Sequence, residues 1–325
     1  MEIADLIDGS HTPARIAVVG AGNVGSTFAY ALLLSGLASE IVLIDANRAR
    51  AEGEAMDISH ALPFTPSARV WAGDYADCAD AAITVITAGA AQKPGETRLD
   101  LARKNADIFA QIVPAASAGN GLLLVATNPV DVLTYAALKQ SGLAPHRVLG
   151  SGTILDTARF RYLLSRHFDI AAHSIHAYII GEHGDSEVPV WSLANIAGLR
   201  LNDFCAAHGV SLAPEHKAEI FAATRDAAYH IIERKGSTYY AVAAGLVQIV
   251  RAILRDENTV LSVSSLMNGL YGIHDVCLSL PTVVNRNGVH RVLELQLTEE
   301  EQAQLCHSAD TLKSHIAALG LSTNH

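Results

Sequence analysis

The sequence predicts an α/β protein in which a doubly wound parallel sheet is followed by a second, α+β domain. Short apolar runs alternate with helical segments up to Gly150, and a glycine-rich turn follows the first run. Beyond Gly150 the pattern changes to long helices and alternating stretches. We therefore expect domains at 1–150 and 151–325. The composition around the boundary is not that of a linker, so we expect the two domains to pack tightly.

The first half alternates strands and helices in chain order. Apolar runs typical of buried parallel strands occupy 15–20, 41–45, 70–72, 82–88, 122–127 and 148–149. Helical patterns occupy 24–35, 48–60, 99–118 and 128–140, and Pro114 is expected to bend the third. In the second half, helices are expected at about 152–167, 214–234, 238–256 and 299–318, and strands near 174–180, 259–264 and 276–293.

Composition excludes several classes of protein. The 325-residue chain is 50% apolar and carries a net charge of −10 with no basic block, which argues against nucleic acid or an anionic membrane as partner. The N-terminus has no signal-peptide pattern, and the longest apolar candidate, 239–254, contains Gln248 and Arg251. The four cysteines form no CxxC pair and are typical of reduced thiols. We expect a cytoplasmic protein.

The turn GAGNVG at residues 20–25 predicts a Rossmann-type dinucleotide site. It follows a strand and opens a helix, and Asp45 ends the next strand about 20 residues further on. Asp45 can accept hydrogen bonds from ribose hydroxyls and would repel a 2′-phosphate, which favours NAD over NADP. The alternative is a glycine-rich turn in an unrelated α/β fold. The expected cofactor contacts are Gly20, Gly22, Asn23, Val24, Gly25 and Asp45.

The stretch AQKPGETRLDL at 91–101 predicts a hinged loop over a small polar anion. Pro94-Gly95 cannot continue a helix or strand, and Arg98 stands where a helix begins. A loop that closes in this way excludes water and completes a catalytic site. The uncharged amide of Gln92 would leave the facing part of the substrate without a charge partner, whereas an arginine would require a second carboxylate. The alternative is a solvated surface loop.

Later in the chain, Asp156, Arg159 and His183 form a candidate catalytic group. Asp156 and Arg159 are spaced i, i+3, so both can face one side of a helix, although an ordinary intrahelical ion pair has the same spacing. His183 lies between two glycines after an apolar strand, where it can meet substrate. A metal site built from His173, His176 and His183 is disfavoured, because their spacing matches no standard zinc pattern. We expect no bound metal.

Taken together, these segments resemble the L-lactate/malate dehydrogenase family over nearly the whole chain. The resemblance rests on GAGNVG, LID, QKPGETRLDL, TNPVD, GSGTILDTARFRYLL, GEHGDSEVPVWS and KGSTYYA. Within the family, Gln92 and the TARFRYLL and KGSTYY stretches are most similar to the bacterial NAD-dependent L-lactate dehydrogenases. The malate enzymes typically have arginine at the position of Gln92.

The resemblance implies hydride transfer between NADH and pyruvate, and the reverse reaction from L-lactate. It implies that His183 is the acid and base, that Asp156 orients it, and that Arg159 binds the substrate carboxylate. Further implied contacts with substrate come from Arg98, which polarises the carbonyl, and from Gln92, Asn128 and Thr238; Asn128 would also lie near the nicotinamide.

The resemblance also implies a homotetramer, and a possible fructose 1,6-bisphosphate site made by Arg161 and His176 at a subunit interface. The alternative there is a surface arginine and a half-buried histidine. Two other functions stay open: malate dehydrogenase or another L-2-hydroxy acid dehydrogenase of the family, and a non-enzymatic nucleotide-sensing or lens-type protein on the same fold. An intact set of candidate catalytic residues speaks against the last.

Overall fold

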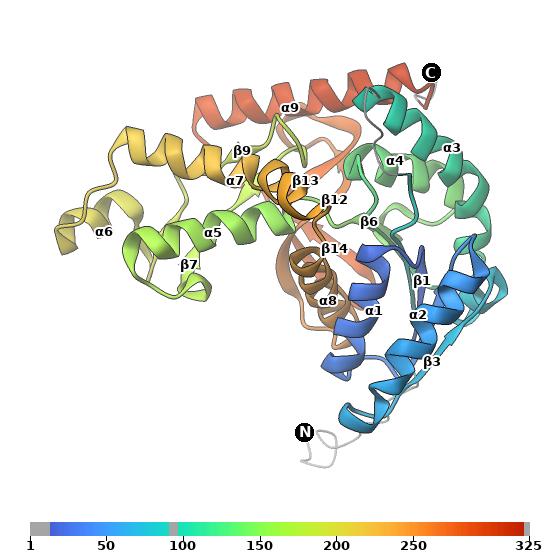
Figure 1. Ribbon diagram of the computed structural model, residues 1–325. Coiled ribbons are helices and arrows are strands. Elements are labelled where there is room, and N and C mark those ends of the chain that lie inside the picture. The colour runs from blue at the N-terminus through green and yellow to red at the C-terminus, as the bar shows by residue number, and fades with distance from the viewer. Residues whose placement is uncertain (1–13, 91–96, 322–325) are drawn as a thin grey trace, which may run out of the picture.

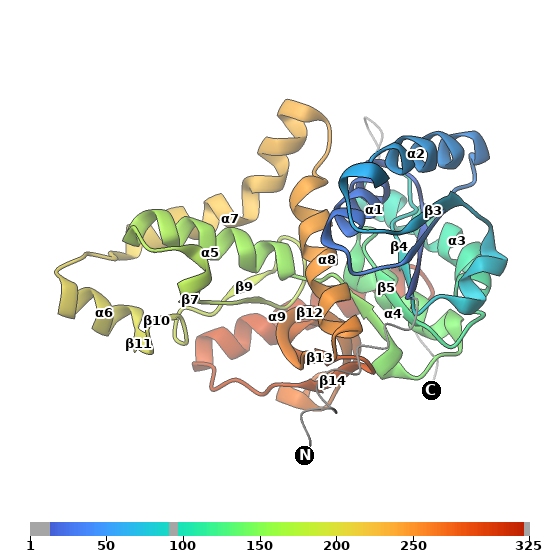
Figure 2. The same cartoon turned by 90° about the horizontal axis from the view of Figure 1, so that it is seen from below.

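The structure is a computed structural model that describes residues 14–90 and 97–321, apart from the side chain of Arg98. Figure 1 shows the first half of the chain, from blue to green, built around one sheet with helices on both sides. In the turned view of Figure 2, α5, α6 and α7 extend away from this part. No helix in the described ranges is both long and apolar enough to cross a membrane.

The first half alternates strands with helices, as the sequence predicts. Its strands are β1 (Arg15–Val19), β2 (Glu40–Ile44), β3 (Arg69–Ala72), β4 (Ile83–Ile86), β5 (Leu122–Val125) and β6 (Val148–Gly150). Its helices are α1 (Asn23–Ser35), α2 (Arg48–His60), α3 (Arg98–Ala116) and α4 (Val130–Ser141), with 3₁₀ turns η2 (Leu62–Phe64), η3 (Tyr75–Asp80) and η4 (Pro145–Arg147). Pro114 lies inside α3, near its C-terminal end.

The second half contains long helices and a mixture of short and long strands. The helices are α5 (Ile154–Phe168), α6 (Leu201–His208), α7 (Pro214–Lys235), α8 (Tyr240–Leu254) and α9 (Glu299–Ala318), with 3₁₀ turns η5 (Ala172–Ser174) and η6 (Leu270–Gly272). The strands are β7 (Ile175–His176), β8 (Ile179–Ile180), β9 (Val188–Pro189), β10 (Asn195–Ile196), β11 (Leu199–Arg200), β12 (Thr259–Asn268), β13 (His274–Asn285) and β14 (Gly288–Val292).

A single nine-stranded sheet runs through both halves, in the order β14-β13-β12-β6-β5-β4-β1-β2-β3. From β6 to β3 all neighbouring strands are parallel, as predicted. Beyond β6 the sheet continues with antiparallel strands, because Ser264 of β12 pairs with Gly150. The sequence did not predict this continuation, since the pairing partner lies more than a hundred residues further along the chain.

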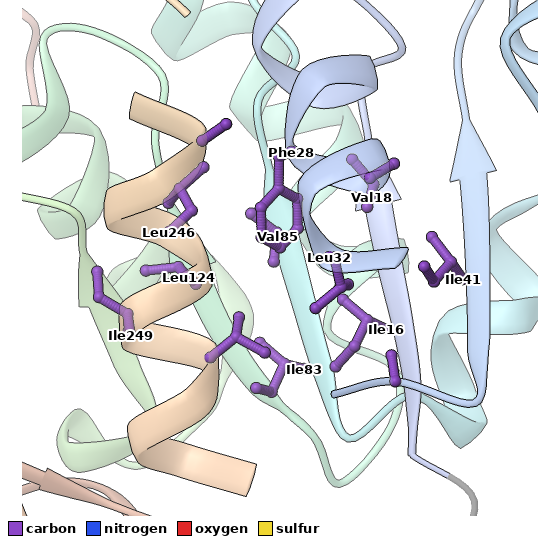
Figure 3. Close-up of a cluster of buried hydrophobic side chains, with 14 of the residues drawn as sticks. Ile16, Val18, Phe28, Leu32, Ile41, Ile83, Val85, Leu124, Leu246 and Ile249 are labelled. Atoms are coloured by element: carbon purple, nitrogen blue, oxygen red, sulfur yellow. The ribbon is translucent and has the colours of Figure 1, made fainter. Parts of the chain in front are cut away.

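Two apolar layers cover the parallel part of the sheet. On one face, α1 and α8 lie side by side, and Phe28, Leu32 and Leu246 pack over the strands (Figure 3). On the other face, Phe109 of α3 and Leu133 of α4 pack against the same strands. Helices on both faces explain why these strands are continuous apolar runs rather than alternating ones.

Candidate functional site

Three glycines form the turn after β1, and the structure separates their roles. Gly20 has φ +104°, and a Cβ there would lie 2.5 Å from the backbone nitrogen of Ala88. A Cβ on Gly25 would lie 1.9 Å from the Gly20 oxygen, so α1 can approach the strand only with glycine at this position. A Cβ on Gly22 would meet nothing within 4 Å. Open space therefore lies beside the middle glycine, where a pyrophosphate would fit.

Helix α1 begins at this open space. Gly22 is its N-cap and supplies no side-chain cap, and no acidic residue stands in the first turn. The first N–H groups of a helix, at Asn23 and Val24 here, have no partner within the helix and attract anions. Asn23 Nδ2 also donates to Ser237 Oγ over 3.1 Å, which brings the α7–α8 connection, with half-buried Thr238, up to the glycine turn.

Asp45 follows β2 and is turned toward the same site. Its Oδ2 accepts from the Ala21 N–H at 2.7 Å, and its Oδ1 accepts from the Asn47 N–H at 2.8 Å. Each carboxylate oxygen retains a lone pair for a ribose hydroxyl. The nearest following arginine, Arg48, donates to the Ala72 and Gly73 oxygens and to Glu52. These contacts occupy the guanidinium that a 2′-phosphate would need, so the residues present fit NAD.

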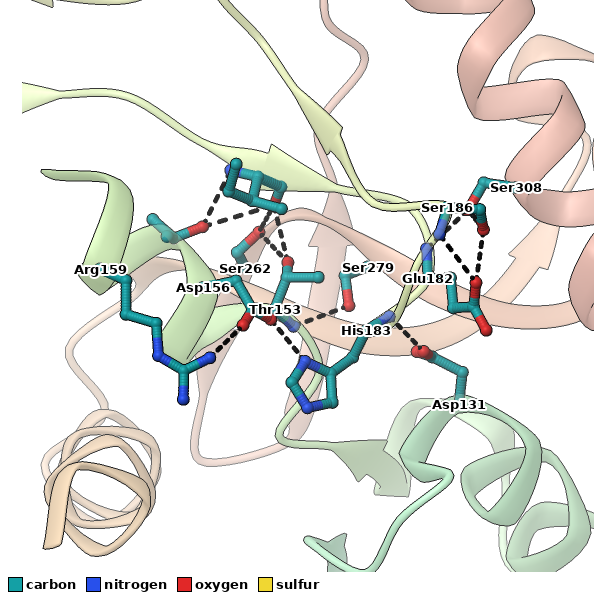
Figure 4. A network of polar contacts seen from close by, with 12 residues as sticks. Asp131, Thr153, Asp156, Arg159, Glu182, His183, Ser186, Ser262, Ser279 and Ser308 are labelled. Carbon is teal, nitrogen blue, oxygen red and sulfur yellow. Dashed lines mark hydrogen bonds and ion pairs between the residues drawn. The ribbon is translucent and has the colours of Figure 1, made fainter. Parts of the chain in front are cut away.

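Asp156, Arg159 and His183 meet at one place, as the sequence predicts. Asp156 and Arg159 come from the first turns of α5, and His183 comes from the loop after β8 (Figure 4). His183 Nδ1 lies 2.5 Å from Asp156 Oδ2, and Arg159 Nη1 donates to Asp156 Oδ1 over 2.9 Å. The Asp156 side chain is 2% exposed, whereas that of His183 is 24% exposed. A buried carboxylate thus orients one ring nitrogen and leaves the other free of this contact.

Electrostatics favour the imidazolium form in this cluster. Burial lowers the pKa of His183, but Asp156 outweighs it, and with smaller contributions from Asp131 and Glu187 the pKa rises to about 9. Burial has the opposite effect on the carboxyl group and raises the pKa of Asp156, but the charges of His183 and Arg159 hold this pKa below its usual value. At neutral pH the site therefore holds a protonated imidazole beside an ionised carboxylate.

The loop that carries His183 is anchored from two sides. On one side, Asp131 Oδ2 of α4 accepts from the His183 N–H over 2.7 Å. On the other, the Glu182 N–H donates to Ser308 Oγ of α9 over 2.7 Å. The Glu182 carboxylate also accepts from Ser186, which closes the loop on itself. These contacts tie the loop to α4 and α9.

Thr153, the residue before α5, and Ser262 tie the start of this helix to the neighbouring strands through their hydroxyl groups. Thr153 Oγ1 donates to the Ile179 oxygen of β8 over 2.6 Å, and the Thr153 N–H donates to Ser279 Oγ of β13. Ser262 of β12 donates to the same Ile179 oxygen over 2.9 Å. Because β8 leads directly into the His183 loop, this buried network sets the distance between Asp156 and His183.

Glu187 is a site residue that the sequence analysis missed. Its side chain is 6% exposed, and its Oε1 has no hydrogen-bond partner among the described residues. Burial and then the charge of Asp156 raise its pKa to about 8. A cavity of about 840 Å³ between α6, α7 and α9 is lined by Glu187 but by neither His183 nor Arg159. Asp131 was missed as well; both lie within quoted motifs, but sequence gives no sign that an acidic residue will be buried.

The remaining predicted substrate residues are placed only in part. Asn128 is exposed, its carbonyl accepts from Asn105 Nδ2 over 2.8 Å, and its peptide bond to Pro129 is cis. Arg98 is the first residue of α3, where a capping box between Thr97 and Asp100 sets the helix start. The side chain of Arg98 and the whole of Gln92 lie outside the described residues.

Arg161, one of the two predicted effector residues, contacts the backbone directly after His176, the other one. Arg161 Nε donates to the Ala177 oxygen over 2.9 Å, and its guanidinium carbon lies 5.1 Å from the Tyr178 ring centre. His176 is the exposed neighbour of Ala177 on β7. Among the described residues, no group of three or more His, Cys, Asp and Glu is arranged to hold a metal ion.

Comparisons with known proteins identify the family of this chain. The family model for the NAD-binding domain of lactate/malate dehydrogenase matches residues 14–150, and the model for the α/β C-terminal domain matches residues 153–320. An L-lactate dehydrogenase of Priestia megaterium is 55% identical over 301 residues, covering 92% of this chain and 94% of that protein. One from Geobacillus stearothermophilus is 54% identical and covers 94% and 96%.

Solved structures give the same result. A lactate dehydrogenase from a Medee basin deep-sea metagenome library superposes with a TM-score of 0.91 at 46% identity, covering 94% of this chain and 99% of that one. The minor L-lactate dehydrogenase of Enterococcus mundtii in its ligand-bound form gives a TM-score of 0.92 at 40% identity, with coverage of 96% and 99%. The chain therefore belongs to the lactate/malate dehydrogenase family.

Proposed function

We propose that this protein is an NAD-dependent L-lactate dehydrogenase that interconverts pyruvate and NADH with L-lactate and NAD. The observation that carries the proposal is the cluster in which Asp156 contacts both His183 and Arg159. Such a cluster offers an acid for a carbonyl oxygen and a cation for a carboxylate within one small site. The related proteins named L-lactate dehydrogenase, at 52–56% identity over most of the chain, support it.

His183 supplies and takes back the proton in this reaction. Its Nδ1 faces Asp156, so Nε2 is the nitrogen that donates to the pyruvate carbonyl and accepts from the lactate hydroxyl. Arg159 uses Nη1 for Asp156, and its remaining N–H donors bind the substrate carboxylate. When bound, the nicotinamide supplies or accepts the hydride. Proton transfer by a group of this kind contributes about 10²–10⁴-fold to rate.

The NAD-binding part corresponds to residues 1–150 and the substrate-binding part to residues 151–325. The first part holds the cofactor through the turn and helix start at Gly20, Gly22, Asn23, Val24 and Gly25, through Asp45, and through Asn128 near the nicotinamide. The open space beside Gly22 supports this assignment. The four cysteines are free thiols, which supports a reducing, cytoplasmic location.

Substrate choice depends on Gln92, Arg98, Asn128 and Thr238 around the carbonyl and the methyl group. Arg98 stabilises the negative charge that develops on the carbonyl oxygen. Gln92 presents no charge to the methyl group, so the pocket prefers pyruvate to oxaloacetate. Replacing Gln92 by Arg should shift preference toward oxaloacetate, because an arginine can pair the second carboxylate. If the variant kept the wild-type ratio of kcat/KM values for the two substrates, Gln92 would not face the substrate, and its assignment to the pocket would be wrong.

A 2-oxo acid panel tests the proposed activity directly. NADH oxidation is followed with pyruvate, oxaloacetate, 2-oxobutyrate and phenylpyruvate, in wild type and in His183→Asn. We expect the highest kcat/KM with pyruvate, and loss of turnover with retained NADH binding in the variant. A preference for oxaloacetate would identify a malate dehydrogenase. An inactive wild type that still binds NADH would favour a nucleotide-sensing or structural role.

The protein is further proposed to assemble as a homotetramer and to bind fructose 1,6-bisphosphate as an effector. Exposed apolar side chains on α1, α2 and η2 support assembly, and the Arg161 guanidinium beside the strand of His176 supports an anion site. The bisphosphate should lower the KM for pyruvate, with a typical coupling of about 1–3 kcal/mol. If calorimetry found no heat of bisphosphate binding and the kinetics were unchanged by the bisphosphate, Arg161 and His176 would have a structural role only.

A further inference from the structure

We propose that Asp131 is a positioning residue that holds the His183 loop at a fixed position relative to Asn128. The inference rests on the proposed function, because it concerns the alignment of an acid with its substrate. Figure 4 shows Asp131 reaching from α4 to the backbone of His183 on the side opposite Asp156. None of the roles assigned above to cofactor or substrate residues involves this carboxylate.

The contact joins two distant parts of the chain. Asp131 is the second residue of α4 and is 1% exposed, and its Oδ2 accepts from the His183 N–H at 2.7 Å. A hydrogen bond to a charged group is stronger than one between two neutral groups. Asp156 fixes the ring of His183, whereas Asp131 fixes its backbone, so the two carboxylates together determine where Nε2 lies.

The same helix start also places Asn128. The Asn128 carbonyl is held by Asn105, and α4 begins two residues later with a bond from the Leu133 N–H to the Pro129 oxygen. Asn128 and Asp131 are therefore part of one rigid segment. A shift of about 1 Å between reacting groups can cost on the order of 10²-fold in rate. Through Asp131, the segment that presents Asn128 to the substrate also aligns the proton donor.

A carboxylate at this position also acts through its charge. Burial raises the pKa of Asp131 to about 6, so it is ionised at neutral pH, and its charge favours the imidazolium of His183. The groups that face it are Glu182 and His183 on the loop, Ser264 on β12 and Cys277 on β13. Asparagine could accept the same hydrogen bond but would carry no charge, so bond and charge can be tested separately.

Two substitutions separate these contributions. Asp131→Asn keeps an acceptor and removes the charge, so kcat at pH 6 should stay within about threefold while the pH at which pyruvate reduction fails moves lower. Asp131→Ala removes both, so kcat should fall by about tenfold or more. The KM for pyruvate and the Kd for NADH should change little, because Arg159 and the glycine turn are untouched.

Thr134→Ser is the matched control. Thr134 is also buried on α4, but its hydroxyl donates only within the helix, to the Val130 oxygen, so wild-type rates are expected. If Asp131→Ala does not fold, Asp131→Ser replaces it, since serine is too short to reach His183 and suits a helix start. Folded variants with wild-type kcat and pH profile would overturn the inference. A wild type inactive on pyruvate would instead overturn the proposed function.

Discussion

His183 has its protonation state set by the carboxyl groups around it. Its pKa of about 9 lies above the ordinary value of 6.5, mainly because Asp156 outweighs burial. The ion pair with Asp156 therefore stabilises the fold fully below about pH 6.5, and this contribution is lost as the pH rises through about 9. In the proposed mechanism the same titration governs catalysis, because pyruvate reduction would need the imidazolium and lactate oxidation would need the neutral ring.

Replacing Asp156 by Asn should therefore lower the pH at which pyruvate reduction fails. Without the carboxylate, burial dominates and moves the pKa of His183 down toward or below 6.5. The measurement is kcat/KM for pyruvate against pH at saturating NADH. The same shift should extend lactate oxidation to lower pH, because the neutral ring then forms at lower pH. Identical profiles for wild type and variant would show that Asp156 does not control this proton.

Replacing Glu187 by Gln should remove a second pH dependence, the weakening of pyruvate binding at alkaline pH. Glu187 is protonated at neutral pH, and its ionisation above about pH 8 would place another negative charge near Arg159. In wild type the KM for pyruvate should rise above pH 8, whereas in the variant it should stay flat until His183 titrates. Parallel KM profiles in the two proteins would contradict this role.

The same substitution should change stability with a defined sign. In the folded protein the pKa of Glu187 is raised from 4.5 to about 8, so ionisation penalises the folded state. The penalty is absent below about pH 4.5 and grows until about pH 8. Across that window the variant should gain over wild type in free energy of unfolding, by a few kcal/mol as an order of magnitude. Urea denaturation at pH 5 and pH 8 measures the difference.

At the scale of elements, the turn between β1 and α1 combines a tightly packed side with an open one. Gly25 permits the helix to approach the strand, and Gly22 leaves space in front of the helix start. The two glycines serve different needs, one of the protein and one of the ligand. Substitution by alanine should therefore give different outcomes at the two positions.

Gly22→Ala should weaken NADH binding by about tenfold or more, roughly 1.4 kcal/mol, and leave the free energy of unfolding nearly unchanged. Its φ of −74° suits alanine, and the added methyl meets no protein atom within 4 Å. Gly25→Ala should destabilise the fold by about 1–3 kcal/mol, because its methyl would overlap the Gly20 oxygen. The readouts are NADH fluorescence titration and thermal unfolding.

Gly53→Ala provides the control for this pair. Gly53 is exposed within α2 and has open space around it, so alanine should stabilise the helix by about 0.5–1 kcal/mol without affecting NADH. If Gly22→Ala bound NADH as tightly as wild type, the space beside Gly22 would not be where the pyrophosphate lies.

At the scale of the whole molecule, the surface near α1 and α2 carries apolar side chains that water would not favour. Phe64 of η2 is 88% exposed and Met56 of α2 is 62% exposed, and Tyr30 and Leu34 of α1 are about half exposed. The Pro66 ring lies against Gly36, which keeps η2 beside the end of α1. An exposed apolar surface of this kind is typical of an interface between protein chains.

Replacing Met56 by Glu together with Phe64 by Ser should therefore reduce the size of the assembly. Burying a glutamate in an apolar interface without a partner costs several kcal/mol, as an order of magnitude. Sedimentation velocity should find a larger species in wild type and a smaller one in the double variant. A wild type that sediments as a monomer would contradict the proposed tetramer.

The sequence alone was enough to predict the parallel part of the sheet, and its family resemblance implied that Asp156 and His183 meet. Apolar runs between helical patterns indicated β1 to β6 in order, the bounds of α2 were predicted to the residue, and those of α9 were predicted approximately. The glycine turn, and the spacing that puts Asp156 and Arg159 on one helix face, also depend on residues close together in the chain. Local periodicity and backbone sterics act over such short distances, which is why sequence reveals them.

Only the tertiary structure decided what depends on residues far apart in the chain. The pairing of Ser264 with Gly150, which extends the sheet into the second half, has no local signature. Helix α6 and the short strands β9 to β11 were not predicted, because two-residue pairings and an eight-residue helix leave little periodicity. The burial of Asp131 and Glu187 beside His183 emerges only when α4, α5 and the loop after β8 converge. Burial and charge proximity are properties of the packed chain, and they set the pKa values on which the proposed chemistry depends.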